Sequence, residues 1–176
     1  MTSRNPIKGR QHSRFLTESL AFIRPPPKSL ALDLQCGSGR HISLLHAWGA
    51  QVIAADLNMN FLRLIQEKEP DVLPILLDAT KALPFSAMAF DLIIAIHPVA
   101  LNFLEAVPKL LRTDGYLIFE SFGAHGGNAV ALPTSGTIRL GLAPSCVPVR
   151  YIEKPTVSMP DRVTVKALFQ RRASPA

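Results

Sequence analysis

Cysteine is scarce in this sequence of 176 residues: only Cys36 and Cys146 are present. Two cysteines allow at most one disulfide, and they do not form the paired spacing of a zinc site. No apolar run is long enough to cross a bilayer. A cleaved signal would need an apolar segment and then small residues after the basic amino end, and the sequence has no such segment there. We therefore expect a cytoplasmic protein with no metal site, no membrane span and no removed leader.

Acidic residues are the minority: 13 Asp and Glu stand against 19 Lys and Arg, a net charge of +6. Such an excess favours contact with phosphates or acidic surfaces but does not define a fold. The basic residues gather toward the two ends of the chain, as Arg4, Lys8, Arg10, Arg14, Arg171 and Arg172. Solvated tails explain this distribution better than a nucleic-acid contact, which remains the alternative.

Short apolar runs alternate with stretches of helical spacing, which is typical of an α/β protein. Five runs are apolar on both faces, as in a buried parallel sheet: 29–34, 51–56, 72–77, 90–96 and 115–122. Two later runs, 147–152 and 162–170, predict a closing pair of strands. Helices are expected over 13–23, over 39–48, from Asn58 to before Pro70, and within 101–111, where Pro108 requires a kink or a late start. The glycine-rich stretch 123–142 predicts a loop and then one short helix.

The length and the apolar content suffice for a single core. We divide the chain into a basic arm with a leading helix (1–28), one folded domain (29–172) and a tail (173–176).

The first predicted strand runs into a glycine-bearing turn, LDLQCGSGR over residues 32–40. A strand that feeds a helix through such a turn places backbone N–H groups at the carboxyl edge of the sheet, where α/β proteins bind nucleotides. The dinucleotide fingerprint needs a third glycine after Gly37 and Gly39, but Ile42 stands at that position. A bound diphosphate is therefore disfavoured.

Acidic residues close the first three predicted strands. Asp33 lies where a carboxylate repels a diphosphate but attracts an ammonium or sulfonium group. Asp56 is placed to accept both hydroxyls of a ribose, and Asp78 to accept an adenine amino hydrogen. A cationic ligand with a ribose and an adenine is S-adenosylmethionine.

The chain resembles the class I S-adenosylmethionine-dependent methyltransferases over roughly 29–122, on the motifs LDLQCGSGR, VIAADLN, LLDATKALPF and FDLIIAIHP. The segment GYLIFESFGAHGGN is similar to the small tellurite-resistance-type branch. The resemblance implies a Rossmann-like, seven-stranded, mostly parallel sheet with helices on both faces and a reversed C-terminal hairpin, so that 29–172 is the methyltransferase domain. It also implies cofactor contacts from ten positions: Asp33, Gln35, Cys36, Gly37, Gly39, Asp56, Leu57, Asp78, Ala79 and Ile96.

One position departs from the pattern of this family. A small residue, most often Gly, is usual where this chain has Gln35, so the Gln35 amide either turns away from the cofactor or crowds its methionine portion. The neighbouring Cys36 lies near a helix start that would lower a thiol pKa, but packing is favoured over a nucleophilic role.

Methyl transfer from a sulfonium needs alignment of donor and acceptor, and it needs a base only if the acceptor carries a proton. His97, after the fourth predicted strand, is the candidate base, with a packed or solvent-facing histidine as the alternative. The tetrapeptide Ile96-His97-Pro98-Val99 lacks the Asn/Asp-Pro-Pro-aromatic pattern of amino-group methyltransferases, which disfavours adenine or Gln as acceptor. Glu120, His125 and Asn128 are expected on the acceptor side, with an ordinary exposed connection as the alternative.

Three functions fit these features. The favoured one is methyl transfer to a small-molecule acceptor, such as a soft sulfur, selenium or tellurium nucleophile. RNA or another nucleic acid is the second acceptor class. The third is a binding protein without catalytic activity, in which Gln35 is the residue that abolishes the activity.

Overall fold

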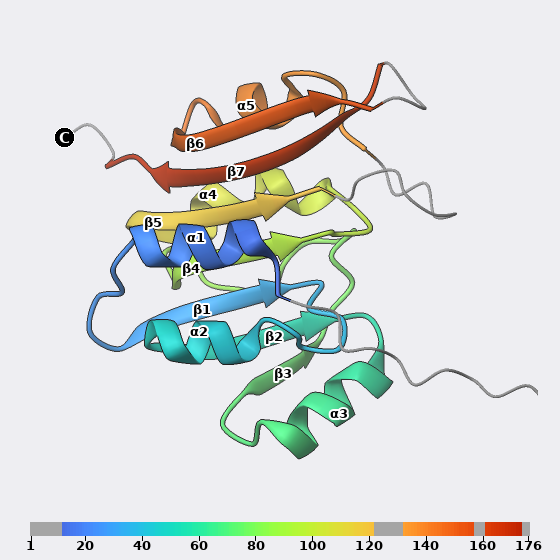
Figure 1. Cartoon of the computed structure of the whole chain (residues 1–176). Coiled ribbons are helices and arrows are strands. Elements are labelled where there is room, and N and C mark those ends of the chain that lie inside the picture. The colour runs from blue at the N-terminus through green and yellow to red at the C-terminus, as the bar shows by residue number, and fades with distance from the viewer. Residues whose placement is uncertain (1–11, 122–131, 157–160, 174–176) are drawn as a thin grey trace, which may run out of the picture.

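Seven strands form one mixed sheet in the computed structural model, which describes residues 12–121, 132–156 and 161–173 (Figure 1). The strands are β1 (Ser29–Leu34), β2 (Ala50–Asp56), β3 (Leu73–Leu76), β4 (Phe90–Ile96), β5 (Leu111–Glu120), β6 (Cys146–Pro155) and β7 (Val163–Arg171). Their order across the sheet is β3-β2-β1-β4-β5-β7-β6. The first five are parallel, and β7 is antiparallel to both β5 and β6, so the predicted sheet and its reversed C-terminal hairpin are confirmed.

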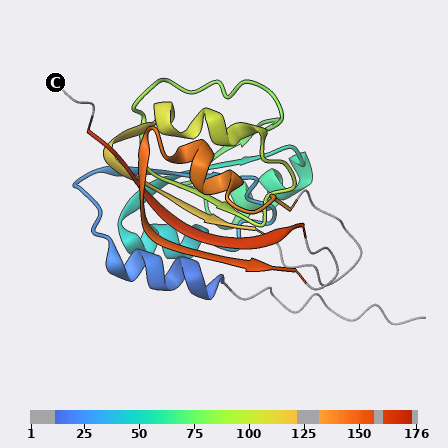
Figure 2. The ribbon, with the colours of Figure 1, turned by 90° about the horizontal axis from the view of Figure 1, so that it is seen from above.

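Helices cover both faces of the sheet, as predicted (Figure 2). The helices are α1 (Arg14–Phe22), α2 (Ile42–Trp48), α3 (Met59–Lys68), the 3₁₀ helix η1 (Asn102–Glu105), α4 (Val107–Leu110) and α5 (Thr137–Leu142). Apolar side chains of α1, α2 and α3 form one buried cluster with the sheet, and those of η1, α4 and α5 form another on the opposite face. None of the helices in the described part of the chain combines the length and apolar composition that a bilayer crossing requires.

Local sequence signals account for the helix ends. The hydroxyl of Ser13 accepts a hydrogen bond from the Leu16 N–H at the start of α1, and the Asn58 side chain accepts from Asn60 at the start of α3. Gly49 ends α2 in the left-handed conformation, at φ 100°. These starts and stops agree with the predicted helices.

The connection into β5 contains the break that Pro108 predicts. The helical region within 101–111 is divided into η1 and α4, and Pro108, which lacks the N–H that a helix interior requires, lies in the first turn of α4. β5 then begins at Leu111 rather than at 115, and its register with β4 shifts before Tyr116. Gly115 is required in this irregular stretch, because a Cβ there would lie 2.9 Å from the carbonyl oxygen of Arg112.

The strand order reverses between β1 and β4, where one half of the sheet is built outward through β2 and β3 and the other through β5. Connections on the two sides of such a switch point diverge and leave a crevice at the carboxyl ends of the strands. The segment between β3 and β4, residues 77–89, contains no helix, and Leu83 and Phe85 within it pack against the core.

Candidate cofactor and acceptor site

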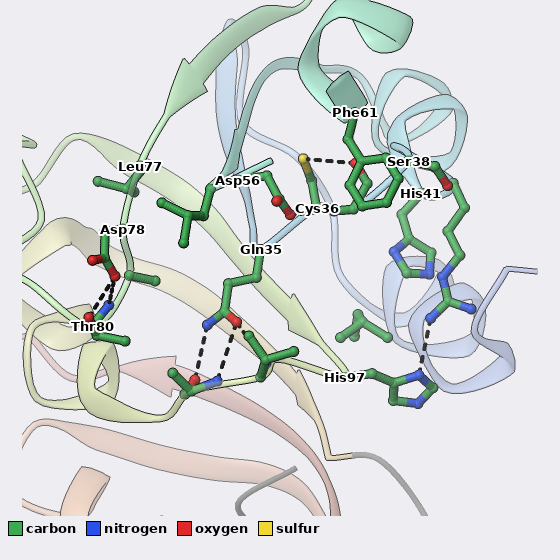
Figure 3. A pocket seen from close by; sticks show the side chains of 17 residues that line it. Gln35, Cys36, Ser38, His41, Asp56, Phe61, Leu77, Asp78, Thr80 and His97 are labelled. Atoms are coloured by element: carbon green, nitrogen blue, oxygen red, sulfur yellow. Dashed lines mark hydrogen bonds between the residues drawn. The ribbon is translucent and has the colours of Figure 1, made fainter. Parts of the chain in front are cut away.

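A cavity of about 300 Å³ lies at the carboxyl ends of β1, β2, β3 and β4 (Figure 3). Its walls include eight of the ten predicted cofactor residues, Gln35, Cys36, Gly37, Asp56, Leu57, Asp78, Ala79 and Ile96, together with His97. Asp33 and Gly39 do not line it. The cavity volume is within the range of small-ligand sites, and its position is the switch point described above.

Asp56 connects the glycine loop to the second strand. One carboxylate oxygen accepts the Gly37 N–H at 2.8 Å, and the other accepts the Asn58 N–H at 2.8 Å. A carboxylate has about four acceptor sites, so two backbone contacts leave capacity for ribose hydroxyls. The same side chain therefore orders the loop and offers acceptors to the cavity.

Gly39 contributes to packing rather than to the cavity wall. It has φ +74°, and a Cβ there would lie 2.6 Å from Ile42 and 2.7 Å from Ile65. The glycine lets the loop pass directly over the side chains of α2 and α3. Close contact with α2 and α3 therefore explains why Gly39 is a glycine.

Gln35 is hydrogen-bonded through its amide to the backbone of Val99 and Ala100, which line the cavity with it. Its Oε1 accepts the N–H of Val99 at 2.7 Å and that of Ala100 at 3.3 Å, and its Nε2 donates to the Ala100 carbonyl at 3.0 Å (Figure 3). The backbone of Gln35 is in the left-handed region, at φ 59°, which explains why glycine is the usual residue here. The side chain therefore joins the first loop to the segment after β4.

Two substitutions separate the backbone cost at Gln35 from its side-chain contacts. Gln35→Gly and Gln35→Ala both remove the three hydrogen bonds, but only Ala retains the left-handed penalty of roughly 1–2 kcal/mol. We expect faster amide hydrogen exchange at Val99 and Ala100 in both variants, and lower stability in the Ala variant than in the Gly variant. Unchanged exchange at these two amides would contradict the assigned role.

Asp33 lies beneath the loop, with 1% of its surface exposed. Its Oδ2 has no hydrogen-bond partner among the described residues. Burial raises the pKa of Asp33 to about 7, with Arg40 opposing and Asp56 adding to the increase. This predicted cofactor residue is therefore buried and does not belong to the residues that line the cavity.

Cys36 is buried beside Gly37, and its sulfur lies 3.6 Å from the Gly37 carbonyl oxygen. Burial is the main cause that raises the pKa of the thiol, and the charges of Asp33 and Asp56 add to it. A thiolate is therefore strongly disfavoured, in agreement with a packing role.

Asp78 lies at the far wall of the cavity, after β3. Its Oδ1 accepts the N–H of Thr80 at 3.0 Å and the Thr80 hydroxyl at 2.6 Å, and these contacts lower the pKa of Asp78. The neighbouring Ala79 is buried yet contributes to the wall. The turn after β3 therefore presents an ionised, fixed carboxylate.

His97 closes the other end of the cavity. Its Nδ1 lies 3.2 Å from Nη2 of Arg40 (Figure 3), and its Nε2 lies 3.7 Å from Oε1 of Glu120. A guanidinium has only donors, so a neutral His97 accepts at Nδ1 and carries its proton on Nε2, toward Glu120. His97 is also in the left-handed region, at φ 58°.

Glu120 is buried, and its carboxylate contacts three side chains: those of His97, Lys166 and Ser13. The Lys166 ammonium lies 2.8 Å from Oε1, and the Ser13 hydroxyl donates to Oε2. Burial would raise the pKa of Glu120, but the three partners outweigh it and lower the pKa to about 2. Glu120 is thus an anion between a histidine and a lysine.

Eight lining residues were missed by sequence reasoning: Ser38, Arg40, His41, Phe61, Leu77, Thr80, Val99 and Ala100. Burial lowers the pKa of His41 to about 3, so it is a neutral imidazole in the wall. Phe61 lies in the first turn of α3, and 37% of its surface is exposed. An aromatic residue in the first turn after the Asn58 cap, at the edge where strands end, was the signal that could have indicated it. The predicted acceptor-side residues His125 and Asn128 lie outside the described residues.

The residues around this cavity suit S-adenosylmethionine. Acceptors for a ribose and an amino group lie on one side, at Asp56 and Asp78. The exposed apolar surfaces of Leu57 and Phe61 also line the cavity, where a planar base could cover them.

Residues 32–119, half of the chain, match the family model described as a methyltransferase domain. The chain belongs to this methyltransferase family. The matched residues include the end of β1, the glycine loop, strands β2 to β4 and most of β5, and S-adenosylmethionine is the cofactor of this domain.

A curated relative is the tRNA U34 carboxymethyltransferase of Pseudoalteromonas translucida, 29% identical over 125 residues. That match covers 65% of this chain but only 39% of the relative's length. Two solved structures are similar in fold. The TehB-like methyltransferase of Corynebacterium glutamicum has a TM-score of 0.65 and 22% identity, over 96% of this chain and 90% of that chain. The 1,6-didemethyltoxoflavin N1-methyltransferase of Burkholderia thailandensis, with S-adenosylhomocysteine bound, has a TM-score of 0.63 and 19% identity, over 91% and 78%.

Proposed function

We propose that this protein transfers the methyl group of S-adenosylmethionine to a small-molecule acceptor that approaches beside His97. The observation that carries the proposal is the arrangement of the cavity, with Asp56 and Asp78 on one side and His97 with its Glu120 partner at the other end. In this arrangement the cofactor and the acceptor would meet at the carboxyl end of β4, where the backbone leaves the sheet.

In the proposed complex, Asp56 holds the ribose hydroxyls, Asp78 lies on the adenine side, and the buried charge of Asp33 favours a cationic methionine portion. The cofactor supplies an activated methyl group that an in-line attack removes. The chain contributes alignment and exclusion of water, which are the main requirements of such a displacement.

His97 is suited to take a proton from the acceptor. An acceptor that displaces Arg40 from Nδ1 of His97 can give its proton to that nitrogen, which leaves both ring nitrogens protonated. The Glu120 carboxylate, whose pKa is lowered to about 2, is ionised at neutral pH and would stabilise the resulting imidazolium. An acceptor that is already an anion would need no such step.

A soft sulfur, selenium or tellurium nucleophile is the acceptor class that we favour. Its support is the similarity of the segment 115–128 to the tellurite-resistance-type branch, together with the likeness in fold to a TehB-like methyltransferase. A thiolate or a comparable anion has little need of a base, which agrees with the contact between Arg40 and Nδ1 of His97.

RNA is the second candidate acceptor. Two observations favour it: the curated relative acts on tRNA, and the chain has a net charge of +6.

Calorimetric titration with S-adenosylmethionine and S-adenosylhomocysteine tests the cofactor site first. We expect submillimolar binding of both to the folded protein. Transfer of a labelled methyl group to thiols, chalcogen oxyanions and RNA then separates the two acceptor classes. A folded protein that binds neither compound would overturn the proposal.

His97→Gln tests the base. With an acceptor that loses a proton, we expect kcat to fall by about 10²-fold or more, the usual contribution of a general base, while the Kd of S-adenosylmethionine changes little. A thiolate acceptor should be nearly insensitive to the substitution. An unchanged rate with a protonated acceptor would show that His97 only packs in the wall.

A further inference from the structure

The two faces of the β6–β7 hairpin differ in what covers them. One face packs against α5 through apolar side chains such as Val163 and Val165, which are buried with Ile138 and Leu142. Figure 2 shows α5 on this side of the sheet and α1 on the other. The side chains that alternate with these apolar ones lie on the α1 side, where Leu168 is buried with the α1 cluster and Ile152 packs against it. Beside them, this face also carries basic side chains.

A groove of about 320 Å³ runs between α1 and this face of the hairpin. Its cationic walls are Arg14 from α1, Arg150 and Lys154 from β6, and Lys166 from β7. Arg150 and Lys154 belong to one strand, and Lys166 lies in the paired strand opposite Ile152, between them. Three basic residues of the hairpin are thereby brought to one surface.

Charge in the groove is unbalanced. Four cationic side chains and one carboxylate, that of Glu18, line the groove. A second carboxylate, that of Glu120, lies next to Lys166. Two positive charges therefore remain uncompensated, on an open surface where an anion can approach.

Arg150 is held in place for such a contact. Its Nη1 lies 2.8 Å from the Glu18 carboxylate, and its guanidinium carbon lies 5.0 Å from the centre of the Phe15 ring. An arginine fixed by a carboxylate and an aromatic ring still has unused donors in its planar fork, and this fork matches the oxygens of a phosphate. The exposed Lys154 adds a mobile charge on the same strand.

One buried carboxylate links the groove to the acceptor end of the cavity. Lys166 lines the groove and lies 2.8 Å from Glu120, and Glu120 in turn lies 3.7 Å from His97. The side chains of Lys166 and Glu120 would therefore separate an anion bound in the groove from the candidate base.

We propose that the groove between α1 and the β6–β7 hairpin binds the phosphate groups of the methyl acceptor. The assignment of these phosphates to the methyl acceptor rests on the function proposed above, whereas phosphate binding by the groove does not. The source of the phosphate is either a phosphorylated small molecule or the backbone of a single-stranded RNA, which the two probes below distinguish.

The test measures binding of inorganic tripolyphosphate by calorimetry and of a fluorescent 12-nucleotide oligouridylate by anisotropy, both at low salt. Arg150→Gln combined with Lys154→Gln should weaken binding at least tenfold. The matched control, Arg63→Gln with Lys68→Gln, removes the same charge from exposed positions of α3 and should weaken binding less than twofold. For the oligonucleotide, the slope of log affinity against log salt should decrease by about 1.4 in the groove variant, as expected for two lost phosphate contacts.

Tighter binding of the oligonucleotide than of tripolyphosphate by tenfold or more would identify RNA as the source, and comparable binding would identify a phosphorylated small molecule. The proposal is wrong if neither probe binds the parent protein, or if the groove and control variants lose affinity equally. Titration of all three proteins with S-adenosylmethionine keeps the two proposals apart. A parent protein that does not bind S-adenosylmethionine would contradict the proposed function. Binding of either phosphate probe by that protein would still support phosphate binding in the groove.

Discussion

Asp56→Ala is expected to raise the Kd of S-adenosylmethionine by about tenfold to a hundredfold, corresponding to about 1–3 kcal/mol. The substitution removes the acceptors assigned to the ribose hydroxyls. It also releases the N–H groups of Gly37 and Asn58, which the carboxylate holds at 2.8 Å. The cofactor would therefore lose both a direct partner and the ordered loop beside it.

Calorimetry on three variants separates these two losses. Asp56→Asn keeps one oxygen acceptor and should bind the cofactor with an intermediate affinity. Asp71→Ala removes an exposed carboxylate between α3 and β3 and is the matched control, with an affinity close to that of the parent. If Asp56→Ala binds the cofactor as tightly as the parent, the ribose has been placed at the wrong residue.

The second large effect is on stability: Asp33→Asn should stabilise the protein without cofactor at pH 8 by about 4 kcal/mol. The ordinary pKa of this group is 3.8, and in the folded protein it is raised to about 7. Below pH 3.8 both states are protonated, and the buried acid has no ionisation cost. Between the two values only the unfolded chain ionises, so the folded state loses stability as pH rises, and above pH 7 the loss is constant.

The gain from Asp33→Asn should therefore shrink toward zero as pH falls from 8 to 4. Urea unfolding of parent and variant at both pH values measures this difference. The buried His41, whose pKa is lowered to about 3, affects both proteins equally and cancels in the comparison. A stability gain that is the same at pH 4 and pH 8, or a loss at pH 8, would contradict an ionisation cost at Asp33.

The same variant should bind S-adenosylmethionine less tightly at pH 8, because a buried charge next to the loop would be gone. Higher stability with weaker cofactor binding is the pattern expected of a group kept for function. Asp71→Asn, at an exposed carboxylate, serves as the control for both measurements.

Much of the fold could be predicted because its signals are local. Runs such as 90–96 are apolar on both faces, and a strand with that composition has to be buried by helices on both sides. Asn58 and Gly49 mark helix ends through hydrogen bonds and dihedral angles within a few residues. Once the strands are parallel, the acids that end them meet at one edge, so Asp56 and Asp78 were predicted as neighbours of one cavity.

The sequence by itself therefore determined the α/β architecture, the strand-end location of the site and the acids that line it. Tertiary structure alone decided the environment of each group. It buried Asp33 outside the cavity lining, directed the Gln35 amide to Val99 and Ala100, and brought Ser13 and Lys166 to Glu120. These pairings join residues up to 107 positions apart. Periodicity and capping act within a few residues, whereas burial and charge pairing depend on which strands and helices lie side by side.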